Sequence, residues 1–270
     1  MNIVTIKDDA NRNLARLVAN TRIGRGIVVG LTPDRRHAVE ICWGGGRSDD
    51  SRNRRYKLFE HNRVSTDVAN ENHPPRNPAL TIYNAMGAWD HRTATDGEGY
   101  FIVSNGDQTD TVAVEPPTYS SFVGALSTRT YEPDGPTNTP RITGACRLHI
   151  GKDMEIYMSI LRRATTGDVC EHTTLLDNTF VENRVAAGYC YCLHTYEEDG
   201  TPIPSYRGSP FLVPTMGNGI KEVLNAWWDT IKRPDVVMLA VKFINVRTGK
   251  STVMLKNSQR KIRAKTKTPA

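Results

Sequence analysis

The feature that most constrains the fold is a series of apolar runs of strand length that arrive in pairs, each pair joined by a short turn. Such pairs predict β-hairpins, because strands joined by a few turn residues run antiparallel. The clearest pairs are residues 26–31 with 37–43, 141–150 with 154–162, and 236–246 with 251–255. Two stretches with helical spacing, 119–129 and 219–232, lie between the runs of strands. The pattern predicts an α+β chain of antiparallel sheets with helices packed outside.

The chain is expected to form one domain over residues 1–255. Its 270 residues suffice for a sizeable core, and no internal repeat or long linker divides them. Residues 1–23 include a weakly helical stretch and are expected to pack on the domain as an N-terminal extension. No apolar run approaches the roughly 18–20 residues of a membrane span, so no membrane partner is expected.

The formal net charge of +6 comes entirely from the last fifteen residues. Residues 256–270 hold six Lys or Arg and no acid, so residues 1–255 balance to zero. A basic end of this kind is typical of a solvated, flexible tail. No aromatic residues interleave with the charges to stack bases, so no nucleic-acid partner is expected.

The cysteines indicate a reducing compartment. There are five of them, an odd number with scattered spacing, which does not suggest a disulfide framework. The first residues carry acids where a secretion signal carries a basic region, so we expect a cytoplasmic protein. Cys190 and Cys192 lie in an alternating apolar run and are expected to share one strand face, so no metal site is predicted there.

Polar residues 104–111 follow the apolar run 100–103, which reads as a short buried strand. Asn105-Gly106 is expected to make a turn, because both residues tolerate positive φ. Small polar side chains and two carboxylates come next. The segment is interpreted either as a rigid strand end that binds a polar ligand or as a solvated hairpin turn.

Arginines gather after a run of three glycines at positions 44–46. Guanidinium groups on such a loop are suited to clamp a phosphate, and the alternative is a surface loop balanced by nearby acids. The four arginines are Arg47, Arg52, Arg54 and Arg55. Further on, Tyr83-Asn84 places polar residues within an expected strand over residues 80–86, which indicates either a ligand-facing position or a buried tyrosine bonded to the backbone.

Five sequence pieces, taken in order and at their spacing, resemble the archaeal-type inosine monophosphate (IMP) cyclohydrolase family. The last two are the most specific, since neither is a generic turn or nucleotide motif. The pieces are Gly24-Arg25-Gly26 with Val29-Gly30, Gly46-Arg47-Ser48 with Asn53-Arg54, Asn77-Pro78 with Tyr83-Asn84, Ser104-Asn105-Gly106-x-x-Thr109-Asp110-Thr111, and Tyr131-Glu132-x-Asp134 with Asn138-Thr139-Pro140-Arg141-Ile142.

The resemblance implies a reaction and a fold. The family closes the six-membered ring of 5-formamidoimidazole-4-carboxamide ribonucleotide (FAICAR), giving IMP and water, without metal or organic cofactor. Its fold is a four-layer αββα sandwich like that of the N-terminal-nucleophile hydrolases. Here no Cys, Ser or Thr immediately precedes Gly26, and Thr21 is the nearest candidate, so we expect that fold without its nucleophile.

The resemblance also implies three catalytic residues, Arg54, Tyr83 and Glu132. Arg54 would stabilise charge, Tyr83 would transfer a proton or donate a hydrogen bond at the formyl oxygen, and Glu132 would orient or activate the carboxamide. A purely structural ion pair between Arg54 and Glu132 is the alternative.

A purine nucleotide is the implied partner, and self-association into a homo-oligomer is compatible with the sequence. Candidate phosphate and ribose ligands are Arg47, Asn84, Asn105, Asp107, Thr109, Asp110, Thr111 and Arg141.

Two other functions stay open. The first is an amidohydrolase acting on a related C–N bond, which needs an activated nucleophile. The second is a purine-nucleotide-binding protein without catalysis. Residues 85–98 look like an insertion relative to the family, and within them Asp90 and His91 form a common pair on which no role is based.

Overall fold

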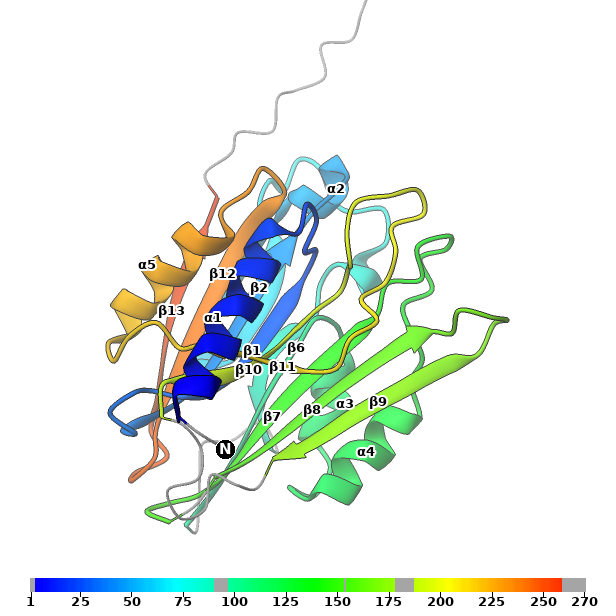
Figure 1. Ribbon diagram of the computed structural model, residues 1–270. Coiled ribbons are helices and arrows are strands. Elements are labelled where there is room, and N and C mark those ends of the chain that lie inside the picture. Colours follow the sequence, from blue (N-terminus) through cyan, green and yellow to red (C-terminus); the bar gives the residue numbers. More distant parts are fainter. Residues whose placement is uncertain (1–2, 90–96, 153, 178–186, 259–270) are drawn as a thin grey trace, which may run out of the picture.

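The computed structural model describes residues 3–89, 97–152, 154–177 and 187–258. It contains two antiparallel β-sheets packed face to face, with helices on both outer sides (Figure 1). The predicted α+β class and antiparallel pairing are confirmed. The predicted pair at Asp90 and His91 lies outside the described residues, as does the tail from residue 259 onward.

The first sheet has six strands in the order β11-β10-β1-β2-β12-β13. Two of the predicted hairpins, β1–β2 and β12–β13, form within it. The last strand extends past its predicted end at Leu255. The strands are β1 (Gly26–Leu31), β2 (His37–Gly45), β10 (Tyr189–His194), β11 (Phe211–Pro214), β12 (Val236–Asn245) and β13 (Ser251–Asn257).

The second sheet has seven strands in sequence order, β3 to β9. The third predicted hairpin is its β7–β8 pair. Strands β4 and β9 fall on segments not predicted to be strands, and β5 begins four residues later than residue 80, where a strand was expected. The strands are β3 (Arg54–Leu58), β4 (Val64–Val68), β5 (Asn84–Ala88), β6 (Glu98–Ser104), β7 (Arg141–His149), β8 (Met154–Arg163) and β9 (Cys170–Asp177).

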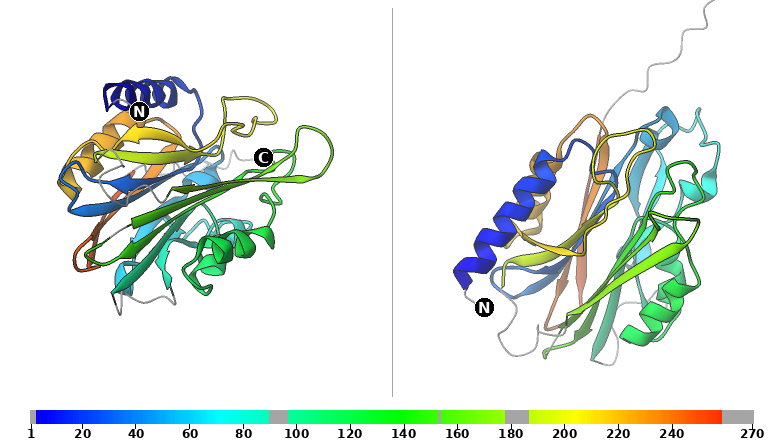
Figure 2. Two further views of the ribbon diagram at one scale, coloured as in Figure 1. Left: turned by 60° about the horizontal axis from the view of Figure 1, so that its bottom comes forward. Right: turned by 45° about the vertical axis from the view of Figure 1, so that its right-hand side comes forward.

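Helices cover the outer face of each sheet (Figure 2). On the six-stranded sheet these are α1 (Ile3–Ala19) and α5 (Ile220–Ile231), and on the seven-stranded sheet α3 (Gln108–Ala113) and α4 (Tyr119–Ser127). Short turns of helix are α2 (Asp49–Arg52), η1 (Glu60–Asn62) and η2 (Pro78–Leu80). In the described part of the chain, no helix combines the length and the apolar character that crossing a membrane requires.

Strand alternation divides the apolar residues between three cores. Along β2, Ala38 and Cys42 face the space between the sheets, whereas Ile41 and Trp43 face the helices. Trp43 stacks on Trp227 of α5 with ring centroids 6.0 Å apart. Each such buried side chain contributes about 1.5–3 kcal/mol, so both faces of the central strands hold the sheets and helices together.

A charged pair lies inside the core between the sheets. Glu40 and Lys242 are paired across β2 and β12, and the Lys242 Nζ lies 3.6 Å from Oε2 of Glu40. Both residues are almost fully buried, and Nζ also donates to the carbonyl of Gly87 in the other sheet at 3.3 Å. Burial raises the pKa of Glu40 to about 7 and lowers the pKa of Lys242. Lys242 thus connects the two sheets, because its buried ammonium group contacts Glu40 in one sheet and the Gly87 carbonyl in the other.

The polar segment after β6 differs from its predicted form. Neither Asn105 nor Gly106 has a positive φ, and the chain continues into helix α3 rather than into a hairpin. Of the two interpretations of this segment, the solvated hairpin turn is therefore wrong. The side chain of Asn105 bonds to the start of β7, because it accepts from the Ile142 amide at 2.9 Å and donates to the Pro140 carbonyl at 2.8 Å.

Candidate functional site

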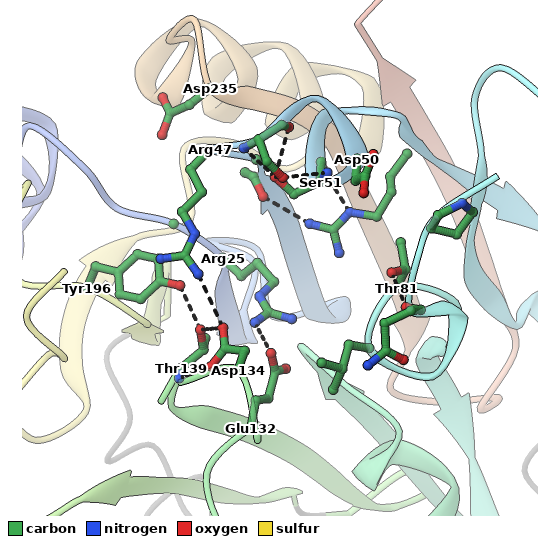
Figure 3. A pocket seen from close by; sticks show the side chains of 18 of the residues that line it. Arg25, Arg47, Asp50, Ser51, Thr81, Glu132, Asp134, Thr139, Tyr196 and Asp235 are labelled. Atoms are coloured by element: carbon green, nitrogen blue, oxygen red, sulfur yellow. Dashed lines mark hydrogen bonds and ion pairs between the residues drawn. The ribbon is translucent and has the colours of Figure 1, made fainter. Parts of the chain in front are cut away.

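A charged cleft of about 250 Å³ opens where β1 begins, β2 ends and β3 begins (Figure 3). Each carboxylate in its lining lies within ion-pair distance of an arginine. The pairs are Arg25–Glu132 (2.6 Å), Arg47–Asp134 (3.5 Å), Arg76–Asp50 (3.6 Å) and Arg22–Asp235 (3.8 Å). One lining arginine, Arg54, is left over. The cleft therefore offers one uncompensated positive charge.

Arg54 is held rigidly although it has no carboxylate partner among the described residues. Its side chain is buried, and Nε donates to the Ser51 carbonyl at 2.9 Å while Nη2 donates to the Gly45 carbonyl at 3.0 Å. Carbonyl oxygens orient the guanidinium without neutralising it. The alternative of an Arg54–Glu132 ion pair is thus contradicted by the geometry, because Glu132 pairs with Arg25.

Arg25 and Glu132 form the floor of the cleft. Arg25 precedes β1, and its Nη1 donates to the Asn105 carbonyl at 2.9 Å while Nη2 donates to Oε2 of Glu132. Burial alone would lower the pKa of Arg25, but the charge of Glu132 and its hydrogen bond raise that pKa above its ordinary value. In the described part of the chain, Oε1 of Glu132 accepts no hydrogen bond. That oxygen is available to a ligand donor.

The loop that carries the arginines is closed on itself. Ser48 and Ser51 form a capping box at α2, and a Cβ on Gly46 would lie 2.4 Å from the Ser51 carbonyl, so glycine is required there. The glycines therefore permit close approach of the chain to itself. Arg52 donates to the Gly46 carbonyl, and Arg55 pairs with Asp67, so neither lines the cleft. Arg47 and Arg54 do.

A chain of hydrogen bonds forms the opposite wall (Figure 3). Asp134 Oδ2 accepts from the Thr139 hydroxyl at 2.6 Å, and that hydroxyl lies 2.8 Å from the Tyr196 hydroxyl. The Tyr196 ring lies against Gly24, where a Cβ would come within 2.4 Å of a ring carbon and where φ is +63°. The sequence prediction did not include Arg25, Asp134, Thr139 or Tyr196. The first three stand within motifs that carry the family resemblance, but Tyr196 has no signal in the sequence.

Tyr83 lies behind the cleft, in the core between the sheets. It is 6% exposed and is not part of the cleft lining, and among the described residues its hydroxyl has no hydrogen-bond partner. It lies near enough to Arg25 to influence the pKa of that arginine. Its backbone is fixed by Thr66, whose hydroxyl accepts from the Tyr83 amide at 2.9 Å. A buried phenol without a partner is costly and needs an explanation.

Other predicted ligands bond to one another rather than lining the cleft. Asp107 receives Arg141 at 2.6 Å and Arg129 at 2.9 Å, and Arg129 also bonds the Thr111 hydroxyl. This network joins α3 to β7 and to the segment after α4. Asn105 supports the cleft from behind through its carbonyl, which accepts from Arg25.

The remaining predicted ligands form two local contacts. Asn84 donates to Asp110 at 2.7 Å, which joins β5 to α3. The Thr109 hydroxyl lies 2.6 Å from that of Ser104 and is fully buried. Of the eight predicted substrate ligands, the lining of the cleft includes Arg47 only. Substrate contact by the other seven stays a prediction.

A second cavity of about 610 Å³ lies elsewhere and contains no predicted site residue. Among the described residues, no three side chains of His, Cys, Asp or Glu gather as a metal site. The smaller cleft is therefore distinguished by its chemistry, namely a buried ion pair beside an unpaired guanidinium.

Comparison with protein families gives one match. A family model described as IMP cyclohydrolase-like protein matches residues 22–250. That range contains the whole cleft and begins after helix α1. No match was found among curated proteins or among solved structures. The match confirms the resemblance seen in the sequence motifs.

Proposed function

The chain belongs to the IMP cyclohydrolase-like family, and from this premise we propose that it closes the ring of FAICAR to give IMP and water. The proposal makes it a cyclohydrolase, an enzyme of the class that acts on C–N bonds of cyclic amidines. It assigns the reaction to the charged cleft between β1, β2 and β3. The fold we propose for it is the αββα sandwich of the N-terminal-nucleophile hydrolases, used without a terminal nucleophile.

The two packed sheets with outer helices support that fold assignment. Thr21, the nearest candidate nucleophile, accepts a hydrogen bond from the Asp199 amide and does not line the cleft. The chemistry is therefore assigned to side chains of the cleft and the core behind it.

The reaction makes three demands on the protein. The carboxamide nitrogen must be held close to the formyl carbon, since such positioning supplies a large part of the rate gain. Negative charge that develops on the formyl oxygen must be stabilised. A proton must leave the nitrogen, and another must reach the departing hydroxyl.

The observation that carries the proposal is the unpaired guanidinium of Arg54. Arg54 is buried, fixed by two carbonyls and, within the described part of the chain, free of a carboxylate partner, and such a cation stabilises a developing oxyanion without reorganising. The other lining arginines each have a carboxylate nearby. Arg54 is thus assigned to the formyl oxygen.

Glu132 is assigned to the carboxamide. Its Oε2 is held by Arg25, while Oε1 has no partner in the described chain and is positioned to accept from the carboxamide nitrogen. The charge-assisted hydrogen bond from Arg25 holds this carboxylate in place.

Tyr83 is assigned to proton transfer at the formyl oxygen. Its hydroxyl, which has no partner among the residues that the structure describes, supports this role, because the substrate would provide the missing hydrogen-bond partner. Arg47, half exposed at the mouth, is assigned to the phosphate. The other predicted ligands are assigned to supporting the cleft from outside its lining. They are Asn84, Asn105, Asp107, Thr109, Asp110, Thr111 and Arg141.

The test is direct incubation of the purified protein with FAICAR, followed by purine absorbance. Appearance of IMP, lost in Arg54→Gln and kept in Arg55→Gln, supports the proposal. Tight binding of IMP without conversion of FAICAR supports a non-catalytic nucleotide-binding protein instead. Release of ammonia or formate from a related nucleotide, without ring closure, supports an amidohydrolase.

A further inference from the structure

The second cavity lies on the outer side of the six-stranded sheet. Its volume is about 610 Å³, and it is bounded by the C-terminal half of α1 and by the segment that connects β10 to β11. In Figure 2 the blue helix α1 runs beside this yellow segment on the outside of the sheet. Helix α1 precedes residues 22–250, the range that matches the family. One wall of this cavity is therefore supplied by a part of the chain outside that range.

Three rings form an aromatic wall in this cavity. His194 and Tyr206 have ring centroids 4.2 Å apart, and Phe211 lies 5.7 Å from His194 and 5.9 Å from Tyr206. Leu17 of α1 adds an aliphatic surface. Apolar and aromatic walls around a volume within about 300–1,000 Å³ are typical of sites for small organic ligands.

His194 supplies a polar atom without a partner. The residue is 5% exposed, and its Nδ1 lies 2.9 Å from the carbonyl of Tyr196. A carbonyl only accepts, so Nδ1 carries the hydrogen and Nε2 of the neutral ring is an acceptor. Burial lowers the pKa of His194 to about 4, which keeps the ring neutral near pH 7. Among the described residues, no group donates to Nε2.

The charges around the cavity do not select for an anion or a cation. Two positive side chains, Arg16 and Arg207, and two negative ones, Glu197 and Glu198, line it. Arg207 is already bonded to the Arg163 carbonyl and lies near Glu171. The rim is thus balanced, whereas the inner wall offers rings and one hydrogen-bond acceptor.

We propose that this cavity is a second small-molecule site, which binds a neutral planar nitrogen heterocycle such as a purine base. The ligand packs against His194, Tyr206 and Phe211 and donates an N–H hydrogen bond to Nε2 of His194. This proposal does not depend on the reaction proposed for the first cleft, because it concerns different residues and is tested by binding rather than by turnover.

The binding test uses the full chain and the fluorescent base 2-aminopurine, whose emission is quenched when it packs against aromatic side chains. Ala19 lines the cavity on α1, and Ala15 is exposed on the same helix without lining it. Saturable quenching is expected in the wild type and in Ala15→Trp. In Ala19→Trp, whose indole fills the cavity, affinity is expected to fall more than about tenfold. Absence of quenching, or equal affinity in both variants, overturns the proposal.

The hydrogen bond has its own test, in which purine and 9-methylpurine compete with 2-aminopurine. Purine carries an N–H donor and 9-methylpurine does not. Purine is expected to bind about 2- to 10-fold more tightly to the wild type, as one net hydrogen bond allows. The preference should vanish in His194→Phe, which keeps a ring and removes the acceptor. Equal binding of both competitors by the wild type overturns the assignment to Nε2, whether or not His194→Phe folds.

Discussion

Arg25 and Glu132 form a buried ion pair, with Nη2 of the arginine 2.6 Å from Oε2 of the carboxylate and side chains only 9% and 4% exposed. Both charged groups are shielded from water, and the charge of each is compensated chiefly by that of the other. Removing one partner leaves an uncompensated charge at the floor of the cleft. The pair thus links the stability of the domain to the chemistry of the site.

Glu132→Gln is expected to lower both turnover and stability. The amide cannot accept the carboxamide proton, and the unpaired charge of Arg25 costs about 3 kcal/mol in the free energy of unfolding. Urea denaturation and FAICAR turnover measure the two effects. Asp67→Asn breaks the exposed pair with Arg55 and should cost less than about 1 kcal/mol, without loss of turnover. Equal stability losses in the two variants would contradict the argument.

Arg54→Gln is expected to lower kcat by about 10²- to 10³-fold, the usual effect of removing one oxyanion donor. Arg54→Lys should recover little, because an ammonium does not reproduce the two carbonyl contacts of the guanidinium. Arg55→Gln is the matched control on the same strand. A kcat for Arg54→Gln within threefold of wild type would rule out the assigned role.

Tyr83→Phe is expected to lower turnover by about 10²-fold or more while IMP affinity is unchanged. Its free energy of unfolding should stay the same or rise by about 1 kcal/mol, since a hydroxyl without a partner is removed. Tyr56→Phe is the control, because the Tyr56 hydroxyl bonds Cys42 and its loss should reduce stability and leave turnover intact. A stability loss in Tyr83→Phe with normal turnover would show that the phenol is structural.

Lys242→Met is expected to destabilise the domain by about 3–5 kcal/mol, because Glu40 is left buried without its cation. The double variant Glu40→Met with Lys242→Met should instead be as stable as the wild type, or more stable, since two buried charges are replaced by apolar side chains. Thermal or urea unfolding of the single and double variants decides this. Additive losses would show that Glu40 and Lys242 do not interact, and would contradict the prediction.

The same pair predicts a pH dependence. The pKa of Glu40 is raised by burial to about 7, so the folded state retains a proton that the unfolded state releases near its ordinary pKa of about 4.3. This contribution to stability is complete below that ordinary pKa and is lost as pH rises to about 7, with a total on the order of 3 kcal/mol. This decrease in the free energy of unfolding with rising pH should be present in the wild type and absent in the double variant Glu40→Met with Lys242→Met. Parallel pH profiles for the two proteins would refute it.

Much of the fold was predictable because local pattern and tertiary structure agree. The hairpin of β1 and β2 combines apolar runs with a turn at Pro33-Asp34, and the helical spacing near Trp227 matches α5. Strand β4 was not predicted, since its sequence Val-Ser-Thr-Asp-Val is polar and gains its stability from pairing on both sides. Helix α3 was missed because a short polar segment has no hydrophobic period.

The candidate site was predictable in part. Arg47, Arg54 and Glu132 stand in motifs and line the cleft together. The alternative of an ion pair joined Glu132 to Arg54 rather than to Arg25, because sequence motifs carry no information on which of two arginines reaches a carboxylate. Tyr196 lies far along the chain, and only the pairing of β10 with β1 brings it to the site.

Tyr196 lines the first cleft and contacts two residues, His194 and Asn20, that line the second cavity. Its phenol stands in the first cleft, bonded to Thr139, while its carbonyl accepts hydrogen bonds from His194 and from Asn20 at the second. One residue therefore connects the linings of the two cavities. By thermodynamic linkage, a ligand that shifts Tyr196 from one side changes affinity on the other, and the second ligand changes affinity for the first by the same factor.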